Sequence, residues 1–377
     1  MLIRLVNPSN CAEFDAYICS APNGHFMQTS AWGRCRPQWE WQGLMEVDSQ
    51  GEILGAMALL SRPISHTGRR QFYAPRGPVV PAQKLAVLSC LLSSAQQLVR
   101  QRGGCLLRMD PQIPEEDPRL RLIESYGFRI TAIDDFSSFQ PRFVYQIPLE
   151  GRSQEAVWQS LDAHTRYNIR LALRRGLRVV DAGPEGCGAF ARLMAQTGHR
   201  KGFRGRSAED YADILVNFGS GAHLWLALDG ADAVAGILCI HQGAQMWNLY
   251  SGASDTGRYH KANELLQWHA MTWALERGCR VYDLRGVEGE PVPENPKYGL
   301  HQFKRHLGAQ LVRYAGQMDW ICRPVSYRMI RLAQRCLQAL HRLPGQGMTA
   351  ARSQLCRCLA ARKSIFPMCA ERKIQKN

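Results

Sequence analysis

The chain has 377 residues, 45% hydrophobic and 21% charged, a composition that is typical of a globular protein and long enough for two domains. Its 13 cysteines are scattered without a paired spacing, which argues against a disulfide framework and against a zinc site. No apolar run reaches the ~20 residues of a membrane-spanning helix, and the start of the chain does not resemble a signal peptide, so we expect a cytoplasmic protein without a bound metal.

The positive charge is unevenly distributed along the chain. Of the formal charge of +15, residues 323–377 carry +11, from 12 Lys or Arg and one acidic residue, whereas 35 basic and 31 acidic residues leave +4 on the rest. Apolar residues recur in this tail at helical spacing. The pattern predicts a basic helical arm for an anionic partner, either the inner face of a membrane or the phosphates of a nucleic acid. A helical hairpin packed on the body, with solvated arginines, is the alternative.

The first part of the chain predicts strands that alternate with helices. Residues 52–60 are expected to form a strand and residues 84–102 a helix, because their apolar residues follow the corresponding spacings. Residues 105–110 predict a second strand. A further strand at residues 143–147 precedes the segment 148–151, where we place the end of the first domain.

The same succession of elements recurs in the second part. Residues 233–240 predict a strand, residues 263–277 a helix and residues 279–283 a second strand. The segments Gly104–Asp110 and Gly278–Asp283 are near-copies of one another in sequence. A repeat at this distance indicates a duplicated α/β domain.

Four short segments carry a resemblance to one protein family. They are Phe26–Arg36 (FMQTSAWGRCR), Tyr73–Val79 (YAPRGPV), Tyr282–Gly286 (YDLRG) and Phe303–Gly308 (FKRHLG). They occur in the order that the family shows and span roughly residues 26–320. The chain therefore resembles the FemABX family, the aminoacyl-ligases that form the cross-bridges of peptidoglycan.

The resemblance implies an α/β (α+β) fold of two tandem domains of the acyl-CoA N-acyltransferase (GNAT) type, followed by the basic helical tail. We expect the first domain at residues 1–148, the second at 149–310, a return to the first domain at 311–322 and the tail at 323–377. The stretch 183–221 is too short for the long helical arm of some relatives, so we expect the armless form.

The resemblance also implies a reaction. An amino acid is transferred from aminoacyl-tRNA to the stem peptide of a peptidoglycan precursor, either lipid II or UDP-MurNAc-pentapeptide, and no cofactor beyond this co-substrate is expected. Because the ester is already activated, the enzyme has mainly to hold an amine near the ester carbonyl and to stabilise the oxyanion. The sequence shows no nucleophile elbow, no convincing triad and no Walker motif.

Two residues of the fourth segment are the candidate catalytic residues. The resemblance places Lys304, preceded by Phe303, where a cation stabilises the ester oxyanion or a nearby phosphate. The alternative is a solvated lysine in the basic run 304–306. Asp110 and Asp283, which end the paired strands, either accept a proton from the attacking amine or cap the next turn.

Four residues match family positions that contact the nucleotide-sugar peptide, namely Arg36, Arg206, Tyr211 and Tyr250. A diphosphate is well bound by guanidinium groups and phenol hydroxyls, which gives these residue types a physical reason. Arg34 is the alternative to Arg36, and Asp210 is the alternative to Tyr211. A surface arginine or a packed tyrosine is the other interpretation of each position.

Several functions stay open. The same fold serves aminoacyl-phosphatidylglycerol synthases and other GNAT acyltransferases, although the Gly-rich pyrophosphate loop of CoA enzymes is not evident after residues 233–240. A non-catalytic protein that binds tRNA or an anionic membrane is a further alternative. Residues 164–170 predict a basic helix face, which either contacts a tRNA acceptor stem or is solvated. We expect the tail to hold the protein peripherally at the inner membrane face.

Overall fold

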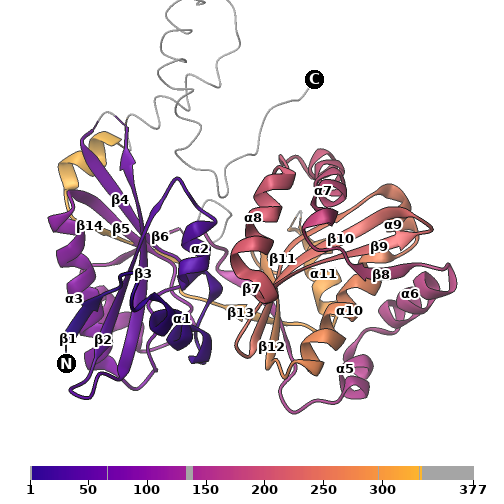
Figure 1. Cartoon of the computed structure of the whole chain (residues 1–377), viewed down its shortest axis with the longest axis horizontal. Coiled ribbons are helices and arrows are strands. Elements are labelled where there is room, and N and C mark those ends of the chain that lie inside the picture. Colours follow the sequence, from indigo (N-terminus) through magenta and orange to yellow (C-terminus); the bar gives the residue numbers. More distant parts are fainter. Residues whose placement is uncertain (1, 66, 133–138, 296, 331, 333–377) are drawn as a thin grey trace, which may run out of the picture.

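The computed structural model describes residues 2–65, 67–132, 139–295, 297–330 and 332, and shows a mixed α/β protein with two domains side by side (Figure 1). Within these residues the strands form two seven-stranded sheets. Most of the expected basic tail lies outside the described residues.

The first sheet has the strand order β1-β2-β3-β4-β5-β14-β6, and within it β4 and β5 are parallel. Its strands are β1 (Leu2–Leu5), β2 (Glu40–Val47), β3 (Ile53–Ile64), β4 (Arg69–Ala74), β5 (Gly104–Met109), β6 (Arg129–Ala132) and β14 (Gln317–Ile321). The accompanying helices are α1 (Cys11–Ser20), α2 (Ser30–Arg34), α3 (Leu85–Gln101) and α4 (Arg119–Ser125). The helix expected at residues 84–102 is α3, whose apolar face packs on the sheet.

The second sheet repeats this arrangement with the order β13-β7-β12-β11-β10-β9-β8. Its strands are β7 (Phe143–Pro148), β8 (Arg178–Asp181), β9 (Ala222–Asp229), β10 (Asp232–Gln242), β11 (Gln245–Ala253), β12 (Val281–Val287) and β13 (Gln310–Arg313). The helices are α5 (Gln154–Ser160), α6 (Ala163–Arg174), α7 (Cys187–Lys201), α8 (Ala208–Phe218), α9 (Asp255–Tyr259), α10 (Ala262–Glu276) and α11 (Tyr298–His306). The parallel pair β11–β12 occupies the position of β4–β5, so the predicted duplication is confirmed.

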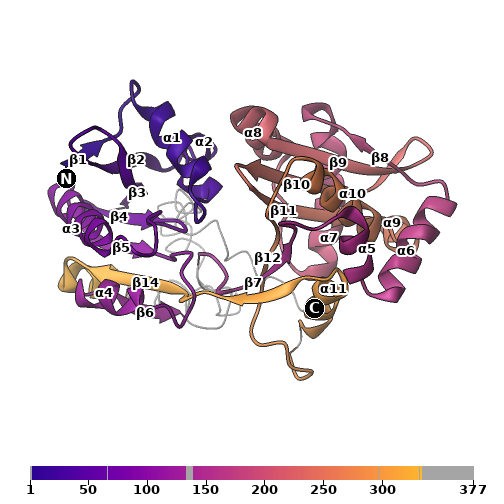
Figure 2. The ribbon, with the colours of Figure 1, turned by 90° about the horizontal axis from the view of Figure 1, so that it is seen from below.

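The two domains exchange strands. The strand β14, which follows the second domain in sequence, crosses back and pairs with β5 and β6 of the first sheet (Figure 2). The strand β7, which follows the first domain in sequence, pairs with β12 and β13 of the second sheet. The division expected at residue 148 falls at the end of β7. Each sheet thus contains one strand that is adjacent in the sequence to residues of the other domain.

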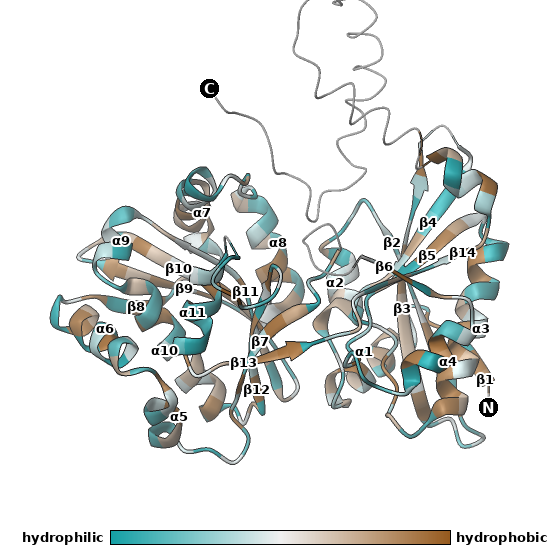
Figure 3. Ribbon diagram, turned by 180° about the vertical axis from the view of Figure 1, so that it is seen from behind, coloured by the Kyte–Doolittle hydropathy of each residue, from teal (hydrophilic) through white to brown (hydrophobic). Residues whose placement is uncertain are grey.

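The interface between the domains is apolar. Figure 3 shows hydrophobic residues along the central strands of both domains, while α11 is largely hydrophilic. One core cluster joins Phe26 and Trp32 of the first domain to Tyr211 and Trp247 of the second. Gln245 Nε2 also donates hydrogen bonds across the interface to the carbonyl oxygens of Pro22 and Gly24, at 3.0 and 3.1 Å. These contacts fix the walls of any cleft between the domains.

A buried ion pair attaches β14 to the first sheet. Arg108 lies opposite Asp319 in the register of β5 and β14, and its Nε and Nη2 donate to the two carboxylate oxygens at 2.7 and 2.6 Å. The Asp319 side chain is fully buried. Removal of the acid would leave the guanidinium buried and unpaired, which is costly.

We therefore predict that Asp319→Ala lowers the free energy of unfolding by about 3–5 kcal/mol. Urea denaturation followed by circular dichroism measures the change. Glu40→Ala removes an exposed carboxylate that pairs with Arg70 and Arg102 and serves as the control, with an expected loss of less than about 1 kcal/mol. Equal losses in the two variants would contradict an anchoring role for Asp319.

Candidate functional site

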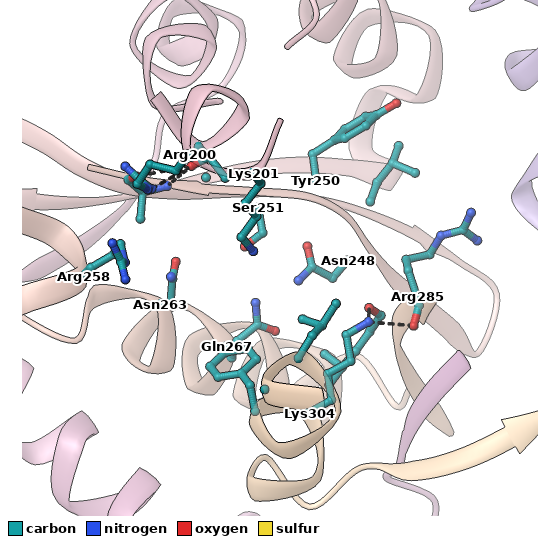
Figure 4. Close-up of a pocket in the computed structure, with 18 residues that line it drawn as sticks. Arg200, Lys201, Asn248, Tyr250, Ser251, Arg258, Asn263, Gln267, Arg285 and Lys304 are labelled. Carbon is teal, nitrogen blue, oxygen red and sulfur yellow. Dashed lines mark hydrogen bonds between the residues drawn. The ribbon is translucent and has the colours of Figure 1, made fainter. Parts of the chain in front are cut away.

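A first cavity opens where the parallel strands β11 and β12 diverge. Their pairing covers only Gln245–Trp247 against Val281–Asp283, so the strands separate beyond these residues. The cavity has a volume of about 680 Å³ and lies between β11, β12 and the helices α7, α10 and α11 (Figure 4). Its polar lining includes Arg200, Lys201, Asn248, Arg258, Asn263, Gln267 and Lys304. We call it the β11/β12 cavity.

A second cavity, of about 710 Å³, lies between the two domains. The first domain contributes Trp32 and Arg36 to its lining, and the second contributes Arg206, Tyr211 and Tyr250. We call it the interdomain cavity. All four residues that were matched to substrate-binding positions therefore lie around one cavity, although they come from distant parts of the sequence.

The two cavities meet at shared residues. Leu249, Tyr250 and Arg285 line both of them. Phe303 and Lys304 line the β11/β12 cavity. The candidate catalytic and binding residues are thus divided between two adjoining spaces, with Tyr250 and Arg285 at the junction.

Lys304 is buried and fully hydrogen-bonded. Its ammonium group donates to the carbonyl oxygens of Leu284, Arg285 and Gly286, at 2.8, 2.9 and 2.9 Å. Burial lowers the pKa of Lys304 to about 7; Asp283 opposes this shift, and the charge of Arg285 adds to it. The lysine is therefore not a solvated member of the run 304–306, and both of its protonation states are accessible near neutral pH.

The segment that Lys304 holds is conformationally unusual. Arg285 has φ +62, in the left-handed region that non-glycine residues seldom adopt. Asp283 stabilises this turn, because its Oδ1 accepts the Arg285 N–H at 2.6 Å and its Oδ2 accepts from Gln146. At Gly286, any Cβ would lie 1.9 Å from the Pro141 ring, so only glycine fits.

Arg285 is a residue at the site that the sequence analysis did not single out. Its Nη2 donates to Gln140 Oε1 at 2.6 Å, and its Nη1 lies 3.4 Å from His25 Nε2. Burial, followed by the charges of Arg285 and Arg76, holds the pKa of His25 well below its ordinary value. Arg285 stands in the YDLRG segment, so the resemblance could have drawn attention to it. The sequence alone does not indicate that its side chain reaches the junction of the cavities.

Arg36 and Arg206 converge on Tyr250. The Arg36 guanidinium lies over the Trp32 ring at 3.8 Å, is 4% exposed, and leaves its Nε without a hydrogen-bond partner. Burial lowers the pKa of Arg36, and its interaction with Tyr250 opposes that shift. The interaction with Tyr250, which includes a hydrogen bond, raises the pKa of Arg206 and is the largest effect on that group. This arrangement places two cations next to a phenol hydroxyl and suits an anionic ligand.

Of the two alternatives to the matched residues, Arg34 lies outside both cavities, whereas Asp210 lines the interdomain cavity as Tyr211 does. Arg34 donates to Asn217 and to Ser30, and is absent from the lining of both cavities. Asp210 forms a capping box with Ser207 at the start of α8. Tyr211 is buried, and its hydroxyl accepts the Arg206 N–H at 3.4 Å, so Tyr211 supports the backbone at Arg206.

Both aspartates that were expected to end strands accept a hydrogen bond from a backbone N–H, although Asp283 lies within β12, which continues to Val287. Asp110 accepts hydrogen bonds from the Arg76 N–H at 2.8 Å and from the Tyr73 hydroxyl at 2.6 Å, as Asp283 does from Arg285. Burial raises the pKa of Asp110. Both carboxylates are thus occupied by neighbours, which favours the structural role.

The motif segments contact one another in pairs. Gln28 of the first segment donates to the Pro75 carbonyl of the second at 2.6 Å, and accepts the Ala58 N–H at 2.7 Å. Lys304 of the fourth segment bonds the third at residues 284–286. The first, third and fourth segments contribute residues to the lining of the cavities, whereas the second supports the first from outside them.

Searches of the described residues found neither a group of three His, Cys, Asp or Glu side chains placed to hold a metal nor a helix long and apolar enough to cross a membrane.

Comparisons with known proteins agree with this geometry. A model of the FemAB family matches residues 10–230 and 229–335. The lipid II:glycine glycyltransferase of Staphylococcus haemolyticus (strain JCSC1435) is 24% identical over 411 aligned residues, covering 89% of this chain and 98% of that protein.

Solved structures show the same architecture. The crystal structure of FemX has a TM-score of 0.80 at 22% identity, and the match covers 88% of this chain and 100% of that one. A tandem GNAT protein from the clavulanic acid biosynthesis pathway has a TM-score of 0.50 at 13% identity, with 85% and 98% covered. The expected fold of two tandem GNAT-like domains is confirmed.

The depressed pKa of Lys304 predicts a pH dependence of stability. Between pH 7 and 10 the unfolded chain keeps the proton on this lysine while the folded chain releases it, so stability that depends on Lys304 rises with pH. We expect the unfolding free energy of the unmodified chain, minus that of Lys304→Met, to increase from pH 6 to pH 9. Urea denaturation at several pH values measures this difference, and a constant difference would contradict the shift.

Proposed function

This chain belongs to the FemAB family, and we propose that it transfers an amino acid from aminoacyl-tRNA to the stem peptide of a peptidoglycan precursor. The observation that carries the proposal is the junction of two cavities at Tyr250 and Arg285. A bimolecular transfer needs two substrates held in separate spaces with their reacting groups in contact. The relatives are lipid II:glycine glycyltransferases, which supports a precursor of this kind as the acceptor.

The interdomain cavity suits the acceptor. Arg36 and Arg206 provide two cations around Tyr250, and the negative charge of a diphosphate group is opposite in sign to theirs. The unpartnered Nε of Arg36 is a donor for such a ligand. In this proposal the stem peptide extends from the diphosphate to the junction.

The β11/β12 cavity suits the aminoacyl end of the tRNA, and we therefore call it the donor cavity. Arg200 and Arg258 lie on one side of it, and Lys304 and Arg285 lie on the opposite side (Figure 4). In this proposal the outer arginines contact RNA phosphates, and the ester lies near Arg285 and the segment that Lys304 holds. The amine of the stem peptide attacks the ester carbonyl, an amide C–N bond forms, the ester C–O bond breaks, and the ribose hydroxyl leaves with a proton.

We propose that Lys304 acts mainly through the segment that it holds. Its ammonium protons are engaged by three carbonyls, so it positions Arg285 and adds positive charge near the developing oxyanion. Phe303 lines the same cavity and helps to exclude water from the ester. No cofactor other than the charged tRNA is part of the proposal.

A transfer assay tests the function. The full chain is incubated with a panel of tRNAs charged with radiolabelled amino acids, and with lipid II, UDP-MurNAc-pentapeptide or phosphatidylglycerol as acceptor. We expect label to enter a peptidoglycan precursor with at least one amino acid. Labelling of phosphatidylglycerol alone, or of no acceptor, would contradict the proposed function.

A matched pair of variants serves as the control for this assay. Lys304→Ala is expected to lower turnover by about 10²-fold, as for the loss of one charged group beside an oxyanion. Arg305→Ala changes the exposed neighbour on α11 and should leave turnover unchanged. Similar activity in the two variants would contradict a role of Lys304 in the transfer.

The assignment of substrates to cavities predicts a split in kinetic constants. Arg36→Ala and Tyr250→Phe should raise the Michaelis constant for the muropeptide more than that for charged tRNA. Arg36 lines the interdomain cavity and not the donor cavity, and the Tyr250 hydroxyl, although its residue borders both, interacts with Arg36 and Arg206. Initial rates with one substrate varied at a time provide the two constants. An effect confined to the tRNA would show that the cavities are assigned the wrong way round.

A further inference from the structure

The outer face of α6 carries arginines that form no ion pair with a carboxylate among the described residues. Residues 163–180 hold five arginines and no aspartate or glutamate. The inward face of the helix consists of Thr165, Asn168, Ile169 and Ala172, all buried. Helical geometry places Tyr167, Arg170 and Arg174 on the opposite side, where all three are exposed. Among the described residues, no ion pair joins the arginines at 166, 170, 174, 175 or 178 to a carboxylate.

These arginines lie against aromatic rings instead. The Arg174 guanidinium lies 5.7 Å from the Tyr167 ring centre, and that of Arg175 lies 4.5 Å from the Tyr259 ring centre. Tyr167 and Tyr259 are 52% and 67% exposed. Exposed guanidinium groups supported by rings are suited to phosphates and to the faces of unpaired bases. We call the surface made by Tyr167, Arg170, Arg174, Arg175 and Tyr259 the α6 face.

The α6 face is continuous with the donor cavity. Arg175 Nη1 donates to the backbone carbonyl of Tyr259 at 2.8 Å, which joins the end of α6 to α9. The residue before Tyr259 is Arg258, which lines the cavity on the side opposite Lys304 (Figure 4). Arg258 and Arg200 both contact Asp255, at 3.5 and 3.3 Å. A row of positive charge therefore leads from the outside of the domain to the cavity.

We infer that the α6 face docks the phosphate backbone of the acceptor stem of the tRNA whose aminoacylated end enters the donor cavity. The inference rests on the proposed function. A polyanion compensates the arginines of the α6 face, none of which forms an ion pair among the described residues, and a duplex stem is recognised mainly through its backbone. The continuity with the cavity favours this ligand over a membrane, because a lipid surface would have no need of a path to Lys304.

A charge reversal separates the docking surface from the chemistry. Arg170→Glu/Arg174→Glu changes two exposed residues that line neither cavity. Arg121→Glu/Arg129→Glu is the matched control, since both positions are exposed on α4 and β6 of the first domain, far from α6 (Figure 2). Each protein is assayed with aminoacyl-tRNA and with an aminoacylated trinucleotide that lacks the stem.

We expect kcat/KM for aminoacyl-tRNA to fall by about 10-fold or more in the α6 variant, whereas kcat/KM for the trinucleotide changes by less than about 2-fold. Binding of uncharged tRNA should also become less sensitive to salt, with the slope of log Kd against log salt reduced by about 2, one for each lost phosphate contact. The control variant should match the unmodified chain. Flotation with phosphatidylglycerol vesicles, run in parallel, should be unaffected.

Other outcomes overturn the inference. Unchanged use of aminoacyl-tRNA by the α6 variant does so, as does an equal loss with both substrates, since that points to general damage. Loss of vesicle binding with unchanged tRNA binding would assign the face to a membrane. If the chain binds tRNA with the expected change of slope but transfers no amino acid to any acceptor, the proposed function fails while the docking surface stands.

Discussion

The three hydrogen bonds from the Lys304 ammonium to the carbonyls of residues 284–286 hold the end of β12 in the shape on which both cavities depend. Parallel strands that continue side by side leave no space between them. Here the pairing of β11 with β12 stops after three residues, and the carbonyls that follow are satisfied by a side chain from α11. The same bonds fix Arg285 in its left-handed conformation, so the junction of the cavities is shaped by one buried cation.

The duplicated domains use this parallel pair differently. In the first domain β4 ends at Ala74, and the space beyond it is filled by Arg76, which is 2% exposed and whose N–H is bonded to Asp110. Arg76 also donates to the carbonyl of Pro141, on the segment that leads to the second domain. Beyond the parallel pair, the first domain thus has a buried arginine where the second domain has a cavity. Two copies of one architecture give one two-sided site.

The elements with strong local patterns were predictable from the sequence. The helices expected at 84–102 and 263–277 agree closely with α3 and α10, because amphipathic spacing is a local signal. The strand expected at 279–283 extends in the structure to Val287, since its later residues pair with β7, a long-range contact. The matched residues around the interdomain cavity came from the family resemblance alone. The position of Arg285 at the junction could not be predicted, because it depends on a left-handed backbone conformation that the spacing of residues in the sequence does not indicate.

The exchange of strands also sets the order in which a growing chain can complete its parts. While the polypeptide is being synthesised, the place between β5 and β6 stays vacant until residues 317–321 have been made, after the whole second domain. The second sheet needs nothing beyond β13 and can close earlier. A chain terminated before residue 317 would carry one finished sheet and one with an exposed seam, where Met318 and Trp320 should have been buried and where Arg108 has lost its counter-ion. Such fragments would be prone to aggregation or proteolysis because their first domain is incomplete, although the missing residues lie at the far end of the sequence.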